Sequence, residues 1–138
     1  MDPEGLAGFR EIEHVADWEL EVWAPDLTAL LEQAARGMYT LAGLKLEGEQ
    51  PIERSFRLEF QDAESLLVTF LNELLYYLET ERLVFERFDL VLEKDSLLAR
   101  LSGTKIASPG KEIKAATYHN LEIRQSPAGL QAKVVLDV

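Results

Sequence analysis

The sequence predicts an α+β fold in which a mostly antiparallel sheet carries two helices on one face. Three features support this class: segments that alternate between apolar and polar residues, two segments with helical periodicity, and tight turns between the later strands. Tight turns require antiparallel pairing, and amphipathic helices bury their apolar stripe against a sheet. The chain has two passages of a helix followed by strands, which allows a structural duplication too diverged to be visible in the sequence.

Two strands are predicted in the first half of the chain. Residues 17–24 alternate with a period of two: one face is apolar, and the other begins with Asp17, continues with Glu19 and Glu21 and ends with Trp23. A short strand or approach segment over 9–13 precedes them. Residues 52–60 show the same alternation after a polar connector over 45–51. This pattern places one face of each strand on the core and the other face in water.

Two helices are predicted, and each begins after an aspartate. Asp26 and Asp62 can accept a hydrogen bond from a first-turn N–H, and their charge suits the helix dipole. Apolar residues at helical spacing follow both caps, and Gly43 is placed to end the first helix in the left-handed conformation. The second helix runs to about Thr80 and has the wider leucine-rich stripe, so we expect it to lie across the sheet.

The last third of the chain is predicted to consist of strands and turns. A strand over 84–92 changes phase in a way that indicates a bulge near Phe85. Glycine, serine and proline in 102–111 are typical of a loop. The other expected segments are a hairpin turn at 94–95, a strand over 97–101, a long strand over 113–123, a turn at 126–129 and a final strand over 130–138.

Composition narrows the possible functions. The 138 residues fit a single domain, 1–138, with a net charge of −11. This charge repels phosphate backbones and anionic membranes, so we expect a basic protein partner or cations rather than nucleic acid or a membrane as the main target. The absence of cysteine excludes thiolate chemistry and zinc–sulfur sites. No segment is apolar enough to span a bilayer and the first residues do not resemble a signal peptide, so we expect a cytoplasmic protein.

Acidic residues near the two ends of the chain form the first candidate site. Asp17 and Asp137 both fall on solvent-facing positions at strand ends, and Val138 adds a terminal carboxylate. Carboxylates and carbonyls are the ligands that hard cations such as calcium and magnesium prefer. If the two aspartates meet, the chain has a cation site. If they do not, they are ordinary solvated acids of an acidic surface.

Four other polar residues are candidates for supporting roles. His14 and His119 are either structural hydrogen-bonding groups or site residues. Glu73 is either a helix-surface acid or a group that orients His14 or a lysine, and Lys114 either offsets clustered carboxylates or faces water. The chain has no phosphate-binding loop, HExxH motif or nucleophile elbow. A stand-alone hydrolase that uses His14 and Asp17 as acid–base residues is therefore a remote alternative.

Four segments of the chain together resemble the archease family. They are Glu13-His14-Val15-Ala16-Asp17, Leu71-Asn72-Glu73-Leu74-Leu75-Tyr76, Ile113-Lys114-Ala115-Ala116-Thr117-Tyr118-His119 and Leu136-Asp137-Val138. Each segment alone is a weak signal, but all four occur in the family's order and spacing and together cover nearly the whole chain. Archeases are small acidic proteins built from strand-helix-strand-strand modules, which agrees with the predicted layout.

The resemblance implies an accessory protein rather than an independent enzyme. Archeases assist RtcB-type RNA ligases in tRNA splicing and RNA repair, promoting the guanylylated histidine intermediate of the ligase and thus multiple turnover. Family members bind a divalent cation, commonly calcium, with magnesium or manganese as alternatives here. The matching residues are Asp17, Asp137 and Val138, the last through a backbone or terminal oxygen. The resemblance also admits a chaperone-like role toward a tRNA methyltransferase or another RNA-modifying enzyme.

The chain departs from the family pattern in two places. Val15 replaces the usual threonine, so a hydroxyl contact at this position is absent. The predicted loop over 102–111 is shorter than in many relatives, which leaves open any partner contact made through it. Neither departure removes the two aspartates.

Overall fold

The computed structural model describes residues 5–12, 17–46, 50–108 and 110–138. Within these ranges the helices are α1 (Leu27–Ala42) and α2 (Ala63–Glu81), and neither could span a membrane. The strands are β1 (Gly8–Ile12), β2 (Trp18–Ala24), β3 (Lys45–Leu46), β4 (Ile52–Glu59), β5 (Leu83–Leu92), β6 (Ser96–Ser108), β7 (Ala115–Thr117), β8 (Arg124–Ser126) and β9 (Gly129–Asp137).

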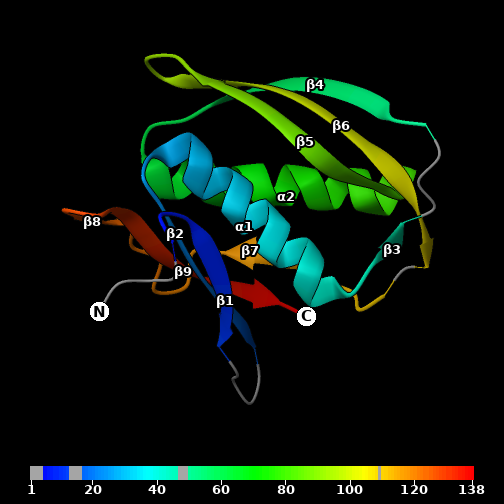
Figure 1. Cartoon of the computed structure of the whole chain (residues 1–138), viewed down its shortest axis with the longest axis horizontal. Coiled ribbons are helices and arrows are strands. Elements are labelled where there is room, and N and C mark those ends of the chain that lie inside the picture. Colours follow the sequence, from blue (N-terminus) through cyan, green and yellow to red (C-terminus); the bar gives the residue numbers. More distant parts are fainter. Residues whose placement is uncertain (1–4, 13–16, 47–49, 109) are drawn as a thin grey trace.

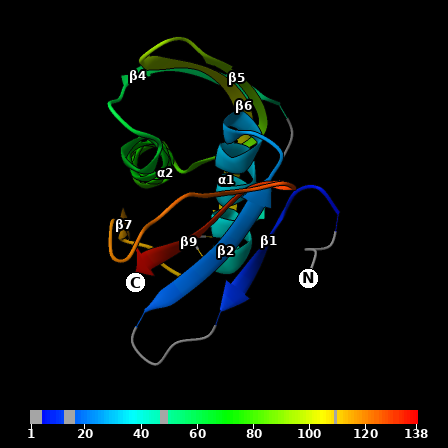
Figure 2. The same cartoon turned by 90° about the vertical axis from the view of Figure 1, so that its left-hand side faces the viewer.

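The helices form a middle layer between two antiparallel sheets, as Figure 1 and the turned view in Figure 2 both show. The first sheet has the strand order β1-β2-β9-β7, and β8 also pairs with β9. The second sheet has the order β3-β6-β4, and β5 also pairs with β6. The α+β class and the antiparallel pairing are confirmed. The strands are, however, divided between two sheets instead of one, because each sheet buries one apolar face on the helices.

Both sheets are built on the same topology. In the first sheet the chain order is β2, α1, β7 and then β9. The spatial order of its strands is β2-β9-β7, so the strand that comes last in the chain lies between the other two. In the second, β4, α2, β5 and β6 place β6 between β4 and β5 in the same way. The chain therefore contains two strand-helix-strand-strand modules. The second module is inserted between α1 and β7 of the first.

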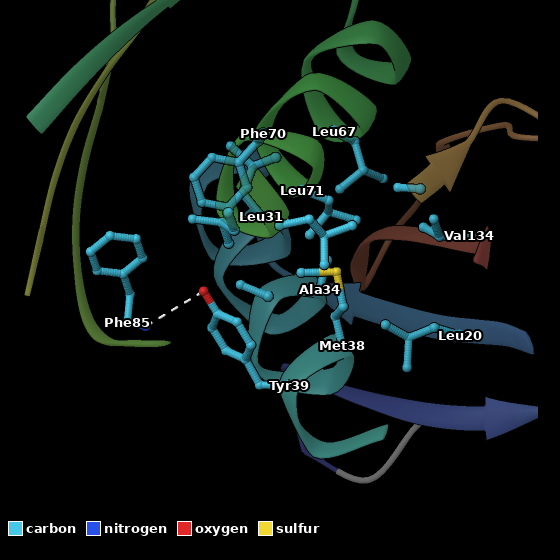
Figure 3. Close-up of a cluster of buried hydrophobic side chains, with 14 of the residues drawn as sticks. Leu20, Leu31, Ala34, Met38, Tyr39, Leu67, Phe70, Leu71, Phe85 and Val134 are labelled. Atoms are coloured by element: carbon cyan, nitrogen blue, oxygen red, sulfur yellow. Dashed lines mark hydrogen bonds between the residues drawn. The ribbon is translucent and has the colours of Figure 1, made fainter. Parts of the chain in front are cut away.

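The hydrophobic core lies between the two helices and the inner faces of both sheets (Figure 3). Leu20 and Val134 of the first sheet and Met38 of α1 are fully buried. On the other side of α1, the backbone N–H of Phe85 donates to the Tyr39 hydroxyl at 3.5 Å. Burial raises the pKa of Tyr39, so the phenol remains neutral and links α1 to β5.

Both helices begin at the predicted caps. Asp26 and Asp62 each accept a hydrogen bond from a backbone N–H of the first turn, at 2.9 Å and 2.7 Å. Gly43 ends α1 with a φ of 65°, as predicted. Arg82 ends α2 with a φ of 56°, which the sequence does not indicate because arginine rarely adopts this conformation.

The predicted loop over 102–111 is wrong, because β6 continues through most of it and pairs with β5 and then with β3. Gly103 belongs to this strand. A Cβ at this position would lie 1.9 Å from the carbonyl oxygen of Val84 on β5. The close approach occurs at a bulge that begins at Phe85, where the sequence predicts one. Glycine here indicates closely packed strands rather than a loop.

The predicted long strand over 113–123 is also wrong. Only β7 forms, and the chain then turns, with the N–H of Leu121 donating to the carbonyl of Tyr118 at 3.0 Å. Asn120 takes the left-handed conformation in this turn, with a φ of 52°, and so interrupts the ladder. The chain then enters β8, which forms a hairpin with β9 through the predicted turn at 126–129.

The remaining predictions concern the turn at 94–95, the connector over 45–51 and the residues before Asp17. The hairpin turn at 94–95 is confirmed, because β5 and β6 pair on either side of it. The connector over 45–51 contains the short strand β3 at its start. Its residues 47–49 lie outside the described ranges, and so do Glu13, at the end of the predicted first strand, His14 and Val15.

Candidate functional site

Asp17 and Asp137 lie at the same end of two neighbouring strands of the first sheet, Asp17 directly before β2 and Asp137 at the end of β9. β2 and β9 pair antiparallel, and their outermost pair at this end is Trp18 with Leu136. Asp17 comes directly before β2 and Asp137 is the last residue of β9, so this register, continued by one step, would place the two aspartates opposite each other. Opposed residues of an antiparallel pair have Cβ atoms about 5 Å apart. Both side chains are exposed and therefore accessible to a cation.

A surface hollow of about 290 Å³ opens beside Asp17. Its lining residues are Asp17, Glu19, His119, Asn120, Lys133 and Val135. His119 reaches the hollow because the chain turns back after β7, and its Nε2 lies 3.3 Å from the side-chain nitrogen of Asn120. The hollow thus brings together two candidates, Asp17 and His119, that the sequence names separately and does not pair.

Asn72 of α2 holds β7 at the edge of the first sheet. Its amide nitrogen donates to the carbonyl of Ala116 at 3.2 Å, and its side-chain oxygen accepts from the Ala116 N–H at 2.8 Å. These two bonds replace the neighbouring strand that β7 lacks on this side. β7 pairs in turn with β9, with Ala115 opposite Asp137. Asn72 therefore supports, through β7, the strand that carries Asp137.

The segment 110–114 contacts both strands that carry the aspartates. The N–H of Lys114 donates to the backbone carbonyl of Asp137 at 2.7 Å, while the Lys114 side chain is exposed. Lys111 places its Nζ 4.3 Å from the centroid of the Trp18 ring, and Trp18 adjoins Asp17. Two lysines therefore lie at the same end of the sheet as the two aspartates.

The structure does not place the two remaining supporting candidates, Glu73 and His14, in the hollow beside Asp17. Glu73 is half-buried on α2 and does not line the hollow beside Asp17. Burial, together with the negative charge of Glu73, raises the pKa of Tyr77 one turn further along the helix. His14 lies outside the described residues, so the structure does not relate it to Glu73.

The donor atoms at the aspartate pair fit a hard cation. Carboxylate oxygens of Asp17 and Asp137 and the backbone oxygen of Val138 are all ligands of the kind that calcium, magnesium and manganese prefer. The backbone oxygen of Asp137 already accepts from Lys114. Among the described residues, no three histidine, aspartate or glutamate side chains converge as a metal site. The protein thus offers two carboxylates here, and further ligands would be backbone or water oxygens.

Sequence reasoning missed the supporting roles of Asn72 and Lys111. Asparagine is unfavourable inside a helix because its side chain competes for backbone hydrogen bonds. A central asparagine in α2 was therefore an available signal for a side chain with a specific partner. Lys111 fell in the predicted loop, and no periodicity in the sequence pairs it with Trp18.

The four segments that carry the resemblance are neighbours in the fold, as far as the structure describes them. Asn72 of the second segment bonds Ala116 of the third. The third pairs with Asp137 of the fourth, and β9 pairs with β2, which starts next to Asp17 of the first. Segments spread over the whole chain thus meet at one end of one sheet.

Comparison with known proteins identifies the same family. The model of the Archease protein family matches residues 9–138. The chain is 34% identical to the protein archease of Methanosarcina mazei, over 94% of this chain and 95% of the relative. It is 33% identical to the protein archease of Pyrococcus furiosus, over 94% of this chain and 98% of the relative.

Two solved structures share the fold. A Methanobacterium thermoautotrophicum protein solved in solution has a TM-score of 0.74 and 27% identity, over 95% of this chain and 99% of that one. The crystal structure of an archease from Thermotoga maritima, described as a possible chaperone, has a TM-score of 0.72 and 27% identity, over 94% of this chain and 96% of that one. The chain belongs to the archease family.

Proposed function

We propose that this chain is a divalent-cation-binding accessory protein that activates an RtcB-type RNA ligase. In this role it promotes guanylylation of the ligase and allows repeated turnover. Membership of the archease family supports the proposal. The observation that carries it is the position of Asp17 and Asp137 at the same end of two paired strands. The four segments that resemble the family meet at this end of the sheet.

The charges around the aspartates suit this role. A bound divalent cation supplies positive charge that phosphate oxygens of a nucleotide can contact. Asp17 and Asp137 would hold the cation, and the exposed His119 in the adjacent hollow is open to a partner surface. The net charge of −11 favours docking on a basic ligase surface and speeds the encounter.

The proposal is tested by ligase guanylylation and by multiple-turnover RNA joining, with and without this protein. A cognate ligase is assayed with GTP at several concentrations of calcium, magnesium and manganese. We expect stimulation by the wild type and loss of stimulation in Asp17→Asn and Asp137→Asn. Asp89→Asn, which removes an exposed carboxylate from the second sheet, is the matched control and should stimulate normally. No stimulation by the wild type at any metal concentration contradicts the proposal.

Cation binding is tested separately by calorimetry. Removal of one of two charged ligands should weaken the affinity at least about tenfold, because even substitutions outside the ligand shell have effects of this size. Asp17→Asn and Asp137→Asn should both show this loss. Equal affinity in the wild type and in both variants would mean that the aspartates do not bind the cation.

A second candidate is a chaperone-like role toward RNA-modifying enzymes such as tRNA methyltransferases. The description of the Thermotoga maritima archease as a possible chaperone favours it. In this case the protein should suppress aggregation of a methyltransferase in stoichiometric amounts, and Asp17→Asn should suppress it equally well. The two candidates thus differ in their dependence on Asp17.

A further inference from the structure

A second hollow, of about 420 Å³, lies between the C-terminal half of α2 and the segment 110–114. Its floor is aliphatic and is formed by Leu75, Leu78, Ile106 and Ile113. The volume is in the range of sites that hold small ligands or a few side chains of a partner. None of its lining residues is an aspartate of the candidate cation site.

Three cations surround this floor: Arg82, Lys111 and Lys114. Elsewhere in the protein, arginines such as Arg54 and Arg57 form ion pairs with glutamates. Within the described part of the chain, none of the three cations around the hollow forms an ion pair with a carboxylate. Lys111 already lies over the Trp18 ring, so Arg82 and Lys114 are the two cations that this chain, with its net charge of −11, keeps available around the apolar floor.

The wall that carries two of these cations is held in place by backbone contacts. The N–H of Lys111 donates to the carbonyl of Ala42 at the end of α1, at 2.8 Å. Gly110 has a φ of +61°, and a Cβ there would lie 2.2 Å from the same Ala42 oxygen. The Lys114 N–H is bonded to Asp137. Because two hydrogen bonds fix the wall, one near each end, the hollow exists before a ligand arrives and little ordering is needed on binding.

We propose that this hollow binds a short acidic segment of a partner protein. An aliphatic side chain of the segment occupies the floor, and carboxylates on either side of it contact Arg82 and Lys114. This binding site goes beyond the proposed function, because neither the cation nor the carboxylate of either aspartate takes part in it.

The lining favours a peptide over a nucleotide. Among the described residues that line the hollow none is aromatic, so these residues offer a base no ring on which to stack. Glu79 and Glu112 also lie on the rim, so the cations alternate with carboxylates there and do not form the continuous positive surface that a multiply charged phosphate chain would need. A peptide can offer carboxylates to the cations and backbone N–H groups to these two glutamates. Acidic segments are repelled by most of this protein's surface, so the cationic rim also determines where they bind.

The test is a titration of the full chain, with labelled leucine and isoleucine methyl groups, followed by NMR. The probe is a blocked five-residue peptide that alternates aspartate with leucine. Two comparison peptides replace aspartate by lysine, or leucine by serine. We expect shifts at the methyl groups of Leu75, Ile106 and Ile113 with the first peptide, and weaker or no shifts with the other two.

Two variants and one matched control locate the binding. Lys114→Glu and Arg82→Glu should each weaken the affinity for the acidic peptide several-fold, about fivefold for reversal of one exposed charge. Lys94→Glu makes the same charge change at the exposed β5–β6 turn and should leave the affinity unchanged. Retained methyl spectra show that each variant is folded, so a failure to bind is interpretable.

Several outcomes would overturn the proposal. The first is the absence of any methyl shift up to about millimolar acidic peptide. The second is binding of the lysine peptide as tight as that of the acidic peptide. The third is an affinity for the acidic peptide in Lys114→Glu and Arg82→Glu equal to that in the control Lys94→Glu. Shifts at the same methyl groups caused by an RNA oligonucleotide, but not by the acidic peptide, would assign the hollow to a different class of ligand. Shifts that depend on protein concentration alone would assign it to a second copy of this chain.

Discussion

At Gly103, the carbonyl oxygen of Val84 lies 1.9 Å from the point where a Cβ would be. The obstacle is backbone of a paired strand, so no side-chain rotation can relieve the clash. At Gly43 the situation is the reverse: the backbone needs a positive φ of 65°, but nothing lies within 4 Å of an added Cβ. The two glycines therefore separate the cost of a steric clash from the cost of a strained backbone conformation.

We expect Gly103→Ala to lower the free energy of unfolding by about 3 kcal/mol or more, since β5 must move away from β6. Gly43→Ala is the control and should cost about 1 kcal/mol, the penalty for an L-residue in the left-handed region. Denaturant unfolding measures both. Similar losses in the two variants would contradict the close packing of β5 on β6.

Asn72→Ala removes two hydrogen bonds and leaves the N–H and C=O of Ala116 without these partners at a half-buried edge. We expect a loss of about 2 kcal/mol in the free energy of unfolding. Asn72→Asp keeps the acceptor for the Ala116 N–H and should lose less. Amide exchange of residues 115–117 should accelerate in Asn72→Ala, and unchanged exchange there would contradict the edge-holding role of Asn72.

At the residue scale, sequence reasoning finds side chains that act locally and misses those that act across the fold. Asp26 and Asp62 were predictable as caps because a cap contacts its own first turn. The pairing of His119 with Asp17 in one hollow depends on a turn and on a strand pairing far away in sequence. Gly103 was assigned to a loop, because the need for glycine there comes from the close approach of another strand, which the local sequence does not show.

At the scale of elements, the two helices end differently. Both close in the left-handed conformation, but α1 uses Gly43 and α2 uses Arg82. An arginine in this conformation carries the steric cost of its Cβ, so α2 ends under mild strain. The periodicity of α2 predicted its extent to within about one residue. The arginine that follows the helix, however, gave no indication that the helix ends there.

Arg82→Gly should therefore raise the free energy of unfolding by about 1 kcal/mol, because glycine adopts this conformation without the steric cost. Arg82→Ala removes the same charge but keeps a Cβ, so it should give no gain. Thermal unfolding of the three proteins is the measurement. An equal gain in both variants would mean that the charge, and not the backbone, is responsible.

α2 is also joined to β4 by an ion pair. Arg54 contacts Glu81 at 2.5 Å, with a second contact from its Nε at 3.1 Å. The hydrogen bond from Arg54 lowers the pKa of Glu81 below its ordinary value of 4.5. A depressed carboxyl pKa contributes stability above the ordinary pKa, and this contribution is lost as pH falls through the folded-state pKa.

We therefore expect Glu81→Gln to be less stable than the wild type at neutral pH. The difference should shrink as pH falls below about 4.5, the ordinary pKa of the group. Unfolding curves between neutral and acidic pH measure it. A difference that is independent of pH would mean that the Glu81 charge does not stabilise the fold.

Alternation and helical periodicity predicted the long elements, with two exceptions. The prediction ended β6 too early because its sequence contains glycine and serine, and it continued the strand over 113–123 through Asn120, where the backbone turns. The division into two sheets was not predictable, since alternation shows which face of a strand is buried but not which strand is its neighbour.

At the scale of the whole molecule, β2 and β9 join the two ends of the sequence. A cation held by Asp17 and Asp137 would bridge these strands only in the folded state. Under the proposed function, calcium at about one hundred times its dissociation constant should add about 2.7 kcal/mol to the free energy of unfolding. Asp17→Asn should lose this gain, and Asp89→Asn should keep it. A gain that survives in Asp17→Asn would place the cation elsewhere.

The inserted module also has a consequence for synthesis on the ribosome. β4, α2, β5 and β6 are contiguous, so this unit can complete its three central strands while the rest of the chain is still being made. β2 and α1 emerge earlier but must wait, because β9, which lies between β2 and β7, is translated after the whole inserted module. Asp17 therefore acquires its neighbour Asp137 only after β9 has been made. A nascent or truncated chain that lacks β9 cannot present the aspartate pair, so under the proposed function such a chain could not activate the ligase.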